Sequence, residues 1–132
     1  MLTSTPEIFL LDTNAMIARL NGDEALSKIL AKAEVVVSST VVGELYFGAY
    51  KSKRVEENIQ NIETFIQGRT VLNCDVITAR WYGQIYHQLR VKGRPIPPND
   101  VWIAAMAVQH NLTLLTKDEH FKEVDNLRLK SW

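Results

Sequence analysis

Four acidic residues of this sequence stand among apolar or small neighbours: Asp12, Glu44, Asp100 and Asp118. Ordinary solvation explains such carboxylates poorly, because apolar surroundings disfavour the charged form. Three of them also have a purely structural interpretation. Asp12 can cap a helix, Asp100 can favour the positive end of its own helix, and Asp118 can be a turn residue. Their chemistry therefore depends on whether the fold brings them together.

Glu44 is the acid that helix capping explains least well. With Thr40 as the N-cap of its helix, the reciprocal glutamate of a capping box belongs at position 43, where the sequence has Gly43. If such acids act as ligands, all-oxygen ligation selects hard cations such as Mg²⁺ or Mn²⁺ over zinc. The sequence shows no obvious imidazole site, and we expect structural or exposed positions for the three histidines His87, His110 and His120.

The acids lie at the ends of segments with clear periodicity. Short apolar runs predict strands at 8–11, 35–37, 70–72, 113–115 and 127–129. Helical spacing of apolar residues predicts helices at 15–20, 23–33, 41–49, 55–66, 76–89 and 99–110. This alternation favours an α/β domain with a mainly parallel sheet covered by helices on both faces.

Two of the acids follow predicted strands. Asp12 comes directly after the strand at 8–11, and Asp118 follows the strand at 113–115 with two residues between. In parallel α/β sheets, function collects at the carboxyl ends of the strands, beside the point where strand order reverses. If these strands are neighbours, both carboxylates project from the same edge.

Length and composition indicate one domain of 132 residues with enough apolar residues for a core. The longest apolar stretches, such as 101–108, are shorter than the roughly 20 residues of a membrane span. The N-terminal residues 1–7 show no export signal, so we expect a cytoplasmic protein without a membrane anchor. Cys74 is the single cysteine, and we expect it to be a small core residue.

Net charge gives no general affinity for nucleic acid, because fifteen basic and fifteen acidic residues cancel. Basic residues nevertheless gather in two places, and these are candidates for local contacts with a polyanion: Lys51, Lys53, Arg54, Arg90, Lys92 and Arg94. Nearby aromatic side chains could stack on unpaired bases or pack against protein: Tyr46, Phe47 and Tyr50.

The segments around the acids resemble, in order and over nearly the whole chain, the motifs of the VapC branch of PIN domains. They are Leu10-Leu11-Asp12-Thr13-Asn14, Val41-Val42-Gly43-Glu44-Leu45, Pro97-Pro98-Asn99-Asp100-Val101-Trp102-Ile103-Ala104-Ala105 and Leu114-Leu115-Thr116-Lys117-Asp118-Glu119-His120-Phe121. One such segment is weak support, but four at suitable separations are specific.

The resemblance implies a single PIN domain over 1–132, with helices around a parallel sheet. It implies that the acids converge as ligands for Mg²⁺ or Mn²⁺, and that polar side chains support them at Asn14 and Thr116. It also implies a metal-dependent endoribonuclease, the toxin of a VapBC-type toxin-antitoxin pair, with a VapB-type antitoxin as partner and a homodimeric state. The role of Glu119 and the number of metal ions stay open.

Converging carboxylates need a cation. Two carboxylates about 5 Å apart repel by roughly 3 kcal/mol at an effective dielectric near 20, so four in one pocket destabilise the empty site or hold protons. A bound cation would make water a better nucleophile and stabilise a phosphorane-like transition state. By resemblance, water attacks the phosphorus in line and leaves a 5′-phosphate and a 3′-hydroxyl.

Other readings remain. A catalytically silent PIN-fold binding module differs from the enzyme only in activity, although the intact acids argue against it. A receiver-type signalling domain requires an acidic pair after its first strand, whereas Leu11 precedes Asp12. A haloacid-dehalogenase phosphatase requires an acid two residues beyond Asp12, where Asn14 stands.

Overall fold

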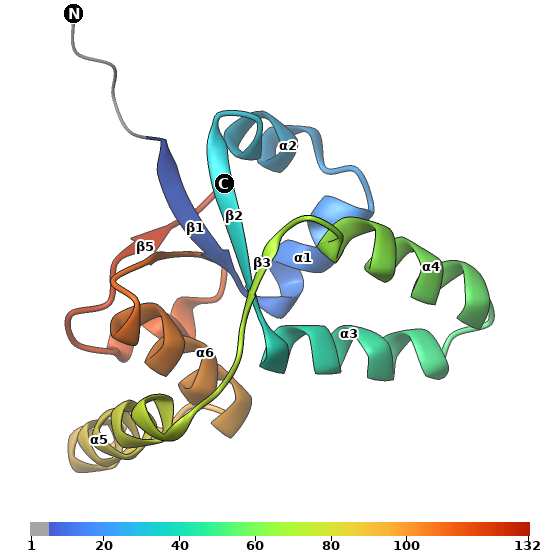
Figure 1. Ribbon diagram of the computed structural model, residues 1–132. Coiled ribbons are helices and arrows are strands. Elements are labelled where there is room, and N and C mark those ends of the chain that lie inside the picture. Colours follow the sequence, from blue (N-terminus) through green and yellow to red (C-terminus); the bar gives the residue numbers. More distant parts are fainter. Residues whose placement is uncertain (1–5) are drawn as a thin grey trace, which may run out of the picture.

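The computed structural model describes residues 6–132, and these contain a five-stranded sheet (Figure 1). All neighbouring strands pair in parallel, in the order β3-β2-β1-β4-β5. The strands are β1 (Glu7–Leu11), β2 (Ala33–Ser38), β3 (Thr70–Leu72), β4 (Thr113–Leu115) and β5 (Leu129–Lys130). The predicted parallel sheet is therefore confirmed.

Helices connect the strands and cover both faces of the sheet. They are α1 (Thr13–Leu20), α2 (Glu24–Leu30), α3 (Ser39–Tyr50), α4 (Val55–Ile66), α5 (Val76–Lys92) and α6 (Pro98–Gln109), followed by the 3₁₀ helix η1 (Glu119–Glu123). Right-handed crossovers place α1 to α4 on one face, because the chain advances from β1 to β3. The return from β3 to β4 runs in the opposite direction and places α5 and α6 on the other face (Figure 1).

The core explains why the strand and helix patterns differ. β1 is central in the sheet, and its residues Phe9, Leu10 and Leu11 are at most 2% exposed, so the strand reads as a continuous apolar run. α6 packs extensively against α5, and its residues from Ile103 to Ala107 are all buried. Because α6 is covered on most sides, its sequence is nearly all apolar rather than amphipathic.

Local signals set the ends of α5. The Asp75 side chain accepts a hydrogen bond from the Thr78 backbone N–H at 2.9 Å, and the Thr78 hydroxyl accepts one from the Asp75 backbone N–H, which completes a capping box. Gly93 ends the helix with φ of 69°, a left-handed conformation that glycine adopts at little cost. Residues next to the helix in the sequence therefore set both of its ends.

Of the possible caps Ser38 to Thr40, Ser38 is the N-cap of α3, and its hydroxyl accepts from the Val41 N–H at 3.1 Å. Two local predictions were wrong. Cys74 is exposed and lies 3.2 Å from the Thr40 hydroxyl, so it is not a core residue. The last strand begins at Leu129, two residues later than predicted.

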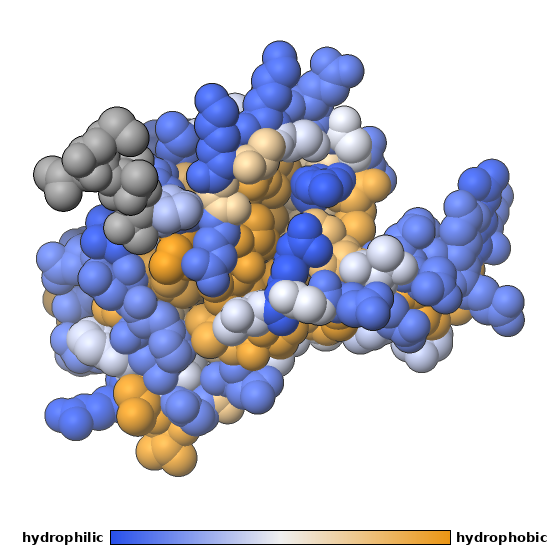
Figure 2. All heavy atoms as spheres, turned by 45° about the horizontal axis from the view of Figure 1, so that its top comes forward, coloured by the Kyte–Doolittle hydropathy of each residue, from blue (hydrophilic) through white to orange (hydrophobic). Residues whose placement is uncertain are grey.

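The α3–α4 hairpin projects from the body as an arm, at the right of Figures 1 and 2. The face in Figure 2 is mostly hydrophilic, with hydrophobic residues in its middle. On α3 the side chains of Phe47 and Tyr50 are 67% and 66% exposed, whereas Tyr46 packs against the core. None of the helices in residues 6–132 combines the length and the apolar character needed to cross a membrane.

Strand order reverses between β1 and β4. The chain runs from β1 outward to β2 and β3, and then returns to place β4 on the other side of β1. Open α/β sheets have their functional crevice at the carboxyl ends of the strands that flank such a switch point. The two strands that Asp12 and Asp118 follow are therefore neighbours, which is the condition for both carboxylates to project from the same edge.

Candidate functional site

Asp12 stands at the end of β1, directly at the switch point, and is 3% exposed. Its Oδ1 accepts a hydrogen bond from the Ala15 backbone N–H at 2.8 Å, so it is the N-cap of α1. Its Oδ2 accepts a second hydrogen bond from the Thr116 hydroxyl. The capping role and a role in a site therefore coexist, because different oxygens of the carboxylate serve them.

Thr116 joins the ends of the two central strands. It is buried directly after β4 and donates its hydroxyl hydrogen to Asp12. The same oxygen accepts a hydrogen bond from the Asp118 backbone N–H at 2.9 Å. One hydroxyl group thus fixes the position of the Asp12 carboxylate and of the chain at Asp118, which is a supporting geometry.

Asp118 and Asp100 lie together with a histidine. The His120 Nδ1 atom is 3.2 Å from Asp118 Oδ1 and 3.9 Å from Asp100 Oδ2. One ligand atom from each of the three residues lies within 4.8 Å of the others. His120 is 57% exposed, as a surface position was expected, but its ring faces the acids. Sequence reasoning missed this contact, for which the only signal was the position of His120 two residues after Asp118.

Glu44 contributes a carboxylate from the second turn of α3. Its Oε1 atom is buried and forms no hydrogen bond within residues 6–132, and the same holds for the Thr13 hydroxyl oxygen. A buried polar atom without a partner costs free energy, so native structures rarely keep one without a function or a bound ion. The unpaired oxygen is the kind of atom that a cation would satisfy.

The electrostatics show that the four acids lie within range of one another. Burial raises the pKa of Asp12, the Thr116 and Ala15 hydrogen bonds oppose that rise, and the charges of Asp118 and Glu44 add to it. The pKa of Asp100 rises from 3.8 to about 6, and burial is the largest cause. The negative charges of Asp118, Glu44 and Asp12 contribute to the same rise, and His120 opposes it.

Two other residues named from the sequence lie differently. Asn14 is exposed in the first turn of α1, and its side chain forms no hydrogen bond within the part of the chain that is described. The Glu119 side chain is 77% exposed and pairs with Lys122 at 2.5 Å, so it turns toward solvent rather than toward Asp118. The structure thus places Thr116 and His120 in contact with the acids, and Glu119 away from them.

The donor set fits a hard divalent cation. Carboxylate oxygens predominate, and mutual repulsion among the acids is relieved when positive charge enters. A single imidazole nitrogen also stands beside Asp100 and Asp118. The side chains of Asp100 and Asp118 are 21% and 26% exposed, so the centre opens to solvent on the side of these two residues.

Comparison with known proteins gives consistent matches. The PIN domain family matches residues 9–127. Ribonuclease VapC2 of Rickettsia felis is 33% identical, with 95% of this chain and 98% of that protein covered. The tRNA(fMet)-specific endonuclease VapC of Shigella flexneri is 34% identical, with 94% and 97% covered.

Solved structures give the same result. VapBC2 from Rickettsia felis, bound to a DNA fragment from its promoter, contains a chain that matches with a TM-score of 0.88 and 30% identity, with 95% of this chain and 98% of that chain covered. DNA-bound VapBC from Salmonella typhimurium matches with a TM-score of 0.85 and 30% identity, with 97% and 99% covered.

Proposed function

The chain belongs to the PIN-domain family, and from this premise we propose that it is an endoribonuclease of the VapC type, the toxin of a toxin-antitoxin pair. The relatives reported above are named as ribonucleases or as an endonuclease, and they align over nearly their whole length. We further propose that one PIN domain over residues 1–132 carries the whole activity.

One observation supports this function most directly: the charges of four carboxylates act on one another at the switch point of the sheet. Two of them have raised pKa values, and Glu44 keeps a buried oxygen without a partner within residues 6–132. A stable protein retains such repulsion and such an unpaired atom mainly where function requires them. The arrangement is that of a cation site rather than of a structural ion pair.

We propose Mg²⁺ or Mn²⁺ as the cation, held by Asp12, Glu44, Asp100 and Asp118, with His120 beside the last two. When bound, the cation would supply positive charge to the phosphorane-like transition state and lower the pKa of the attacking water. Oxygen donors favour these hard ions over softer ones.

The chain's own residues position and tune this centre. Thr116 holds Asp12 and the backbone at Asp118 in a fixed relation, so two ligands are preorganised before anything binds. With its pKa raised to about 6, Asp100 is mostly charged at neutral pH, where its carboxylate would be available to hold a cation. The open side at Asp100 and Asp118 admits a phosphodiester, and hydrolysis by water leaves a 5′-phosphate and a 3′-hydroxyl.

The partner follows from the structural relatives, several of which are complexes named VapBC. We propose that this chain pairs with a VapB-type antitoxin and forms a homodimer. A basic side chain of the antitoxin placed near the carboxylates would relieve their repulsion as a cation does, and it would also block the substrate.

The test is a cleavage assay with the purified chain on total cellular RNA. Cleavage is expected with Mg²⁺ or Mn²⁺ and is expected to stop in excess EDTA, with 5′-phosphate ends on the products. Asp12→Asn serves as the inactive control, because it keeps the size of the buried side chain. Undiminished cleavage in EDTA, or by Asp12→Asn, would refute the proposed cation-dependent centre.

A further inference from the structure

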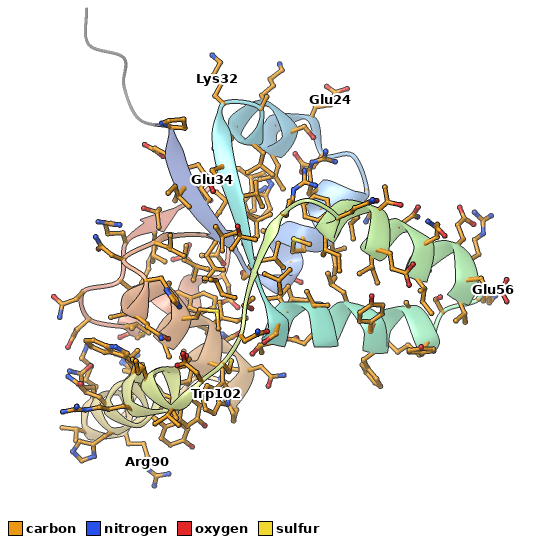
Figure 3. The ribbon with its side chains drawn as sticks, in the orientation of Figure 1. Glu24, Lys32, Glu34, Glu56, Arg90 and Trp102 are labelled. Carbon is orange, nitrogen blue, oxygen red and sulfur yellow. The ribbon has the colours of Figure 1, made fainter. Side chains whose placement is uncertain are left out.

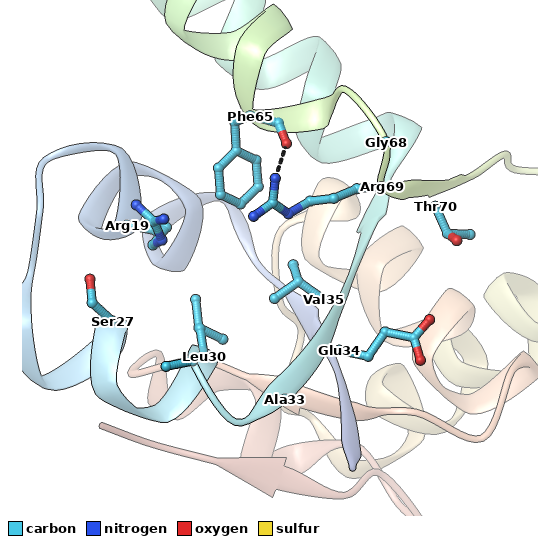
Figure 4. Close-up of a pocket in the computed structure, with 11 residues that line it drawn as sticks. Arg19, Ser27, Leu30, Ala33, Glu34, Val35, Phe65, Gly68, Arg69 and Thr70 are labelled. Carbon is cyan, nitrogen blue, oxygen red and sulfur yellow. Dashed lines mark hydrogen bonds between the residues drawn. The ribbon is translucent and has the colours of Figure 1, made fainter.

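Two arginine side chains line a pocket away from the carboxylates. The pocket has a volume of about 370 Å³ and lies between α1, α2, the start of β2 and the end of α4 (Figure 4). Arg19 comes from the last turn of α1, and Arg69 directly precedes β3. Pockets that bind small groups have volumes of roughly 300 to 1,000 Å³, so this one is large enough for a ligand.

Phe65 holds both guanidinium groups in place. The ring is buried, and its centroid is 4.1 Å from Arg69 Cζ and 5.6 Å from Arg19 Cζ. Arg69 also donates a hydrogen bond to the Phe65 carbonyl oxygen, which Figure 4 shows as a dashed line. Cation–π contacts with one rigid ring therefore orient the two guanidinium groups, whereas acidic side chains usually hold such groups in place.

The positive charge of this pocket is not neutralised. Neither guanidinium forms an ion pair anywhere in residues 6–132. Glu34 is the one acid that lines the pocket, and Figure 4 shows its carboxylate pointing away from Arg69. The hydroxyl-bearing residues Ser27 and Thr70 also line it. Such a set of donors fits an anion, and guanidinium groups bind phosphate oxygens in a bidentate manner.

We propose that this pocket binds a backbone phosphate of the substrate RNA, outside the bond that is cut. This inference rests on the proposed ribonuclease function. An acidic centre repels RNA, so cations elsewhere must hold the strand. Two of the basic residues named from the sequence are already neutralised, because Arg54 pairs with Glu57 at 3.6 Å and Lys92 with Asp125 at 2.6 Å.

The pocket also lies within reach of the centre. Arg19 stands seven residues after Asp12, about 10 Å along the axis of α1. The pocket lies toward the amino ends of β2 and β3, whereas the acids lie at the carboxyl ends of β1 and β4, and α1 connects the two edges. A single RNA strand that leaves the centre along α1 therefore meets Arg19 and Arg69 within a few nucleotides.

The test measures RNA binding without cleavage. A fluorescent single-stranded RNA of mixed sequence is titrated with the full chain in EDTA at several salt concentrations. For Arg19→Gln/Arg69→Gln we expect weaker binding and a log Kd against log salt slope that is lower by about 0.7 per lost phosphate contact. A wild-type slope in this variant overturns the proposal, whether or not the chain proves to cut RNA.

A matched control removes the same charge beside the pocket. Lys28 and Lys32 are exposed residues of the α2 region that do not line the pocket, and Figure 3 shows Lys32 pointing outward. Lys28→Gln/Lys32→Gln is expected to change the slope much less. An equal effect overturns the proposal, because net charge alone then explains binding.

A second variant covers a failure of the glutamine pair to fold. Arg19→Lys/Arg69→Lys keeps both charges and is expected to keep the wild-type slope with a higher Kd, and a slope as low as that of the glutamine pair would contradict this.

Other anions complete the test. AMP binding that the glutamine pair abolishes, with unchanged RNA binding, would overturn the proposal and assign the pocket to a free nucleotide. Loss of poly-glutamate binding alone would assign it to an acidic protein segment.

Discussion

Replacing Asp100 by asparagine separates a cation ligand from a helix-dipole residue, because the two roles change stability in opposite directions. The pKa of Asp100 rises from 3.8 to about 6 on folding, which corresponds to about 3 kcal/mol at roughly 1.4 kcal/mol per pH unit. Its side chain is 21% exposed, so solvent screens this penalty only in part. Without a cation, Asp100→Asn is therefore expected to be more stable than the wild type at pH 7, by up to about 3 kcal/mol.

The sign depends on pH in a defined way. Below pH 3.8 the carboxyl group is protonated in the folded and the unfolded chain, so the folded state bears no penalty. Between pH 3.8 and about 6 the unfolded chain loses the proton first, and the metal-free wild type loses stability as the pH rises. Above pH 6 the full penalty is present. The advantage of Asp100→Asn should therefore be small at pH 4 and reach its maximum near pH 7.

Thermal melts in EDTA and in Mg²⁺ measure these terms. A gain of 1 kcal/mol raises Tm by roughly 3 to 6 °C for a domain of this size. Mg²⁺ at 100 times its Kd should stabilise the wild type by about 2.7 kcal/mol and the variant by less. RNA cleavage by the same preparation of the variant should fall by orders of magnitude.

Glu56→Gln is the matched control, because Glu56 lies in the first turn of α4, at the far tip of the arm (Figure 3). A dipole effect alone costs about 0.3 to 1 kcal/mol, and it does not depend on Mg²⁺. If Asp100→Asn behaves like this control, melts lower in EDTA and still cuts RNA, the reasoning about the centre is refuted.

Three further outcomes are expected. Thr116→Val should lower Mg²⁺ affinity by about 10-fold to 100-fold in a thermal-shift titration, because Asp12 and Asp118 lose a shared partner. Thr116→Ser should keep most of the wild-type affinity, and equal Mg²⁺ affinity in the wild type and both variants would exclude a positioning role for Thr116. His120→Gln should weaken Zn²⁺ binding but not Mg²⁺ binding in calorimetry, because only the imidazole nitrogen favours zinc; unchanged Zn²⁺ affinity would remove His120 from the centre. Production of the chain alone should arrest growth and co-production of its antitoxin should relieve the arrest, whereas normal growth with abundant folded protein would contradict a toxin.

The elements of the fold were predictable because burial leaves a local record. The run from Phe9 to Leu11 is apolar since it lies in the middle of the sheet, and Asp12 interrupts it where the strand ends. The order of the strands in the sheet could not be predicted from any single segment. The neighbouring position of β1 and β4 depends on pairing between Leu11 and Leu115, which are far apart in the chain.

The features that the sequence left open, missed or predicted wrongly have physical reasons. Ser38 and Thr40 are both able to cap α3, and the choice depends on where β2 ends, which is set by the pairing of Ser38 with Leu72. Cysteine is usually buried, but Cys74 follows β3, which is an edge strand, and there it is exposed. His120 reaches the acids through the tight turn of η1, a geometry that residue spacing alone does not reveal.

The hydrogen bond between Thr116 and Asp12 joins residues that are 104 positions apart. During translation, a ribosome must therefore deliver residues through Asp118 before this chain can assemble the four acids. Nascent chains and fragments that end before Thr116 lack the hydroxyl group that joins Asp12 to the backbone at Asp118, so they cannot complete the centre. For a ribonuclease, this order of assembly delays activity until synthesis of the chain is nearly complete.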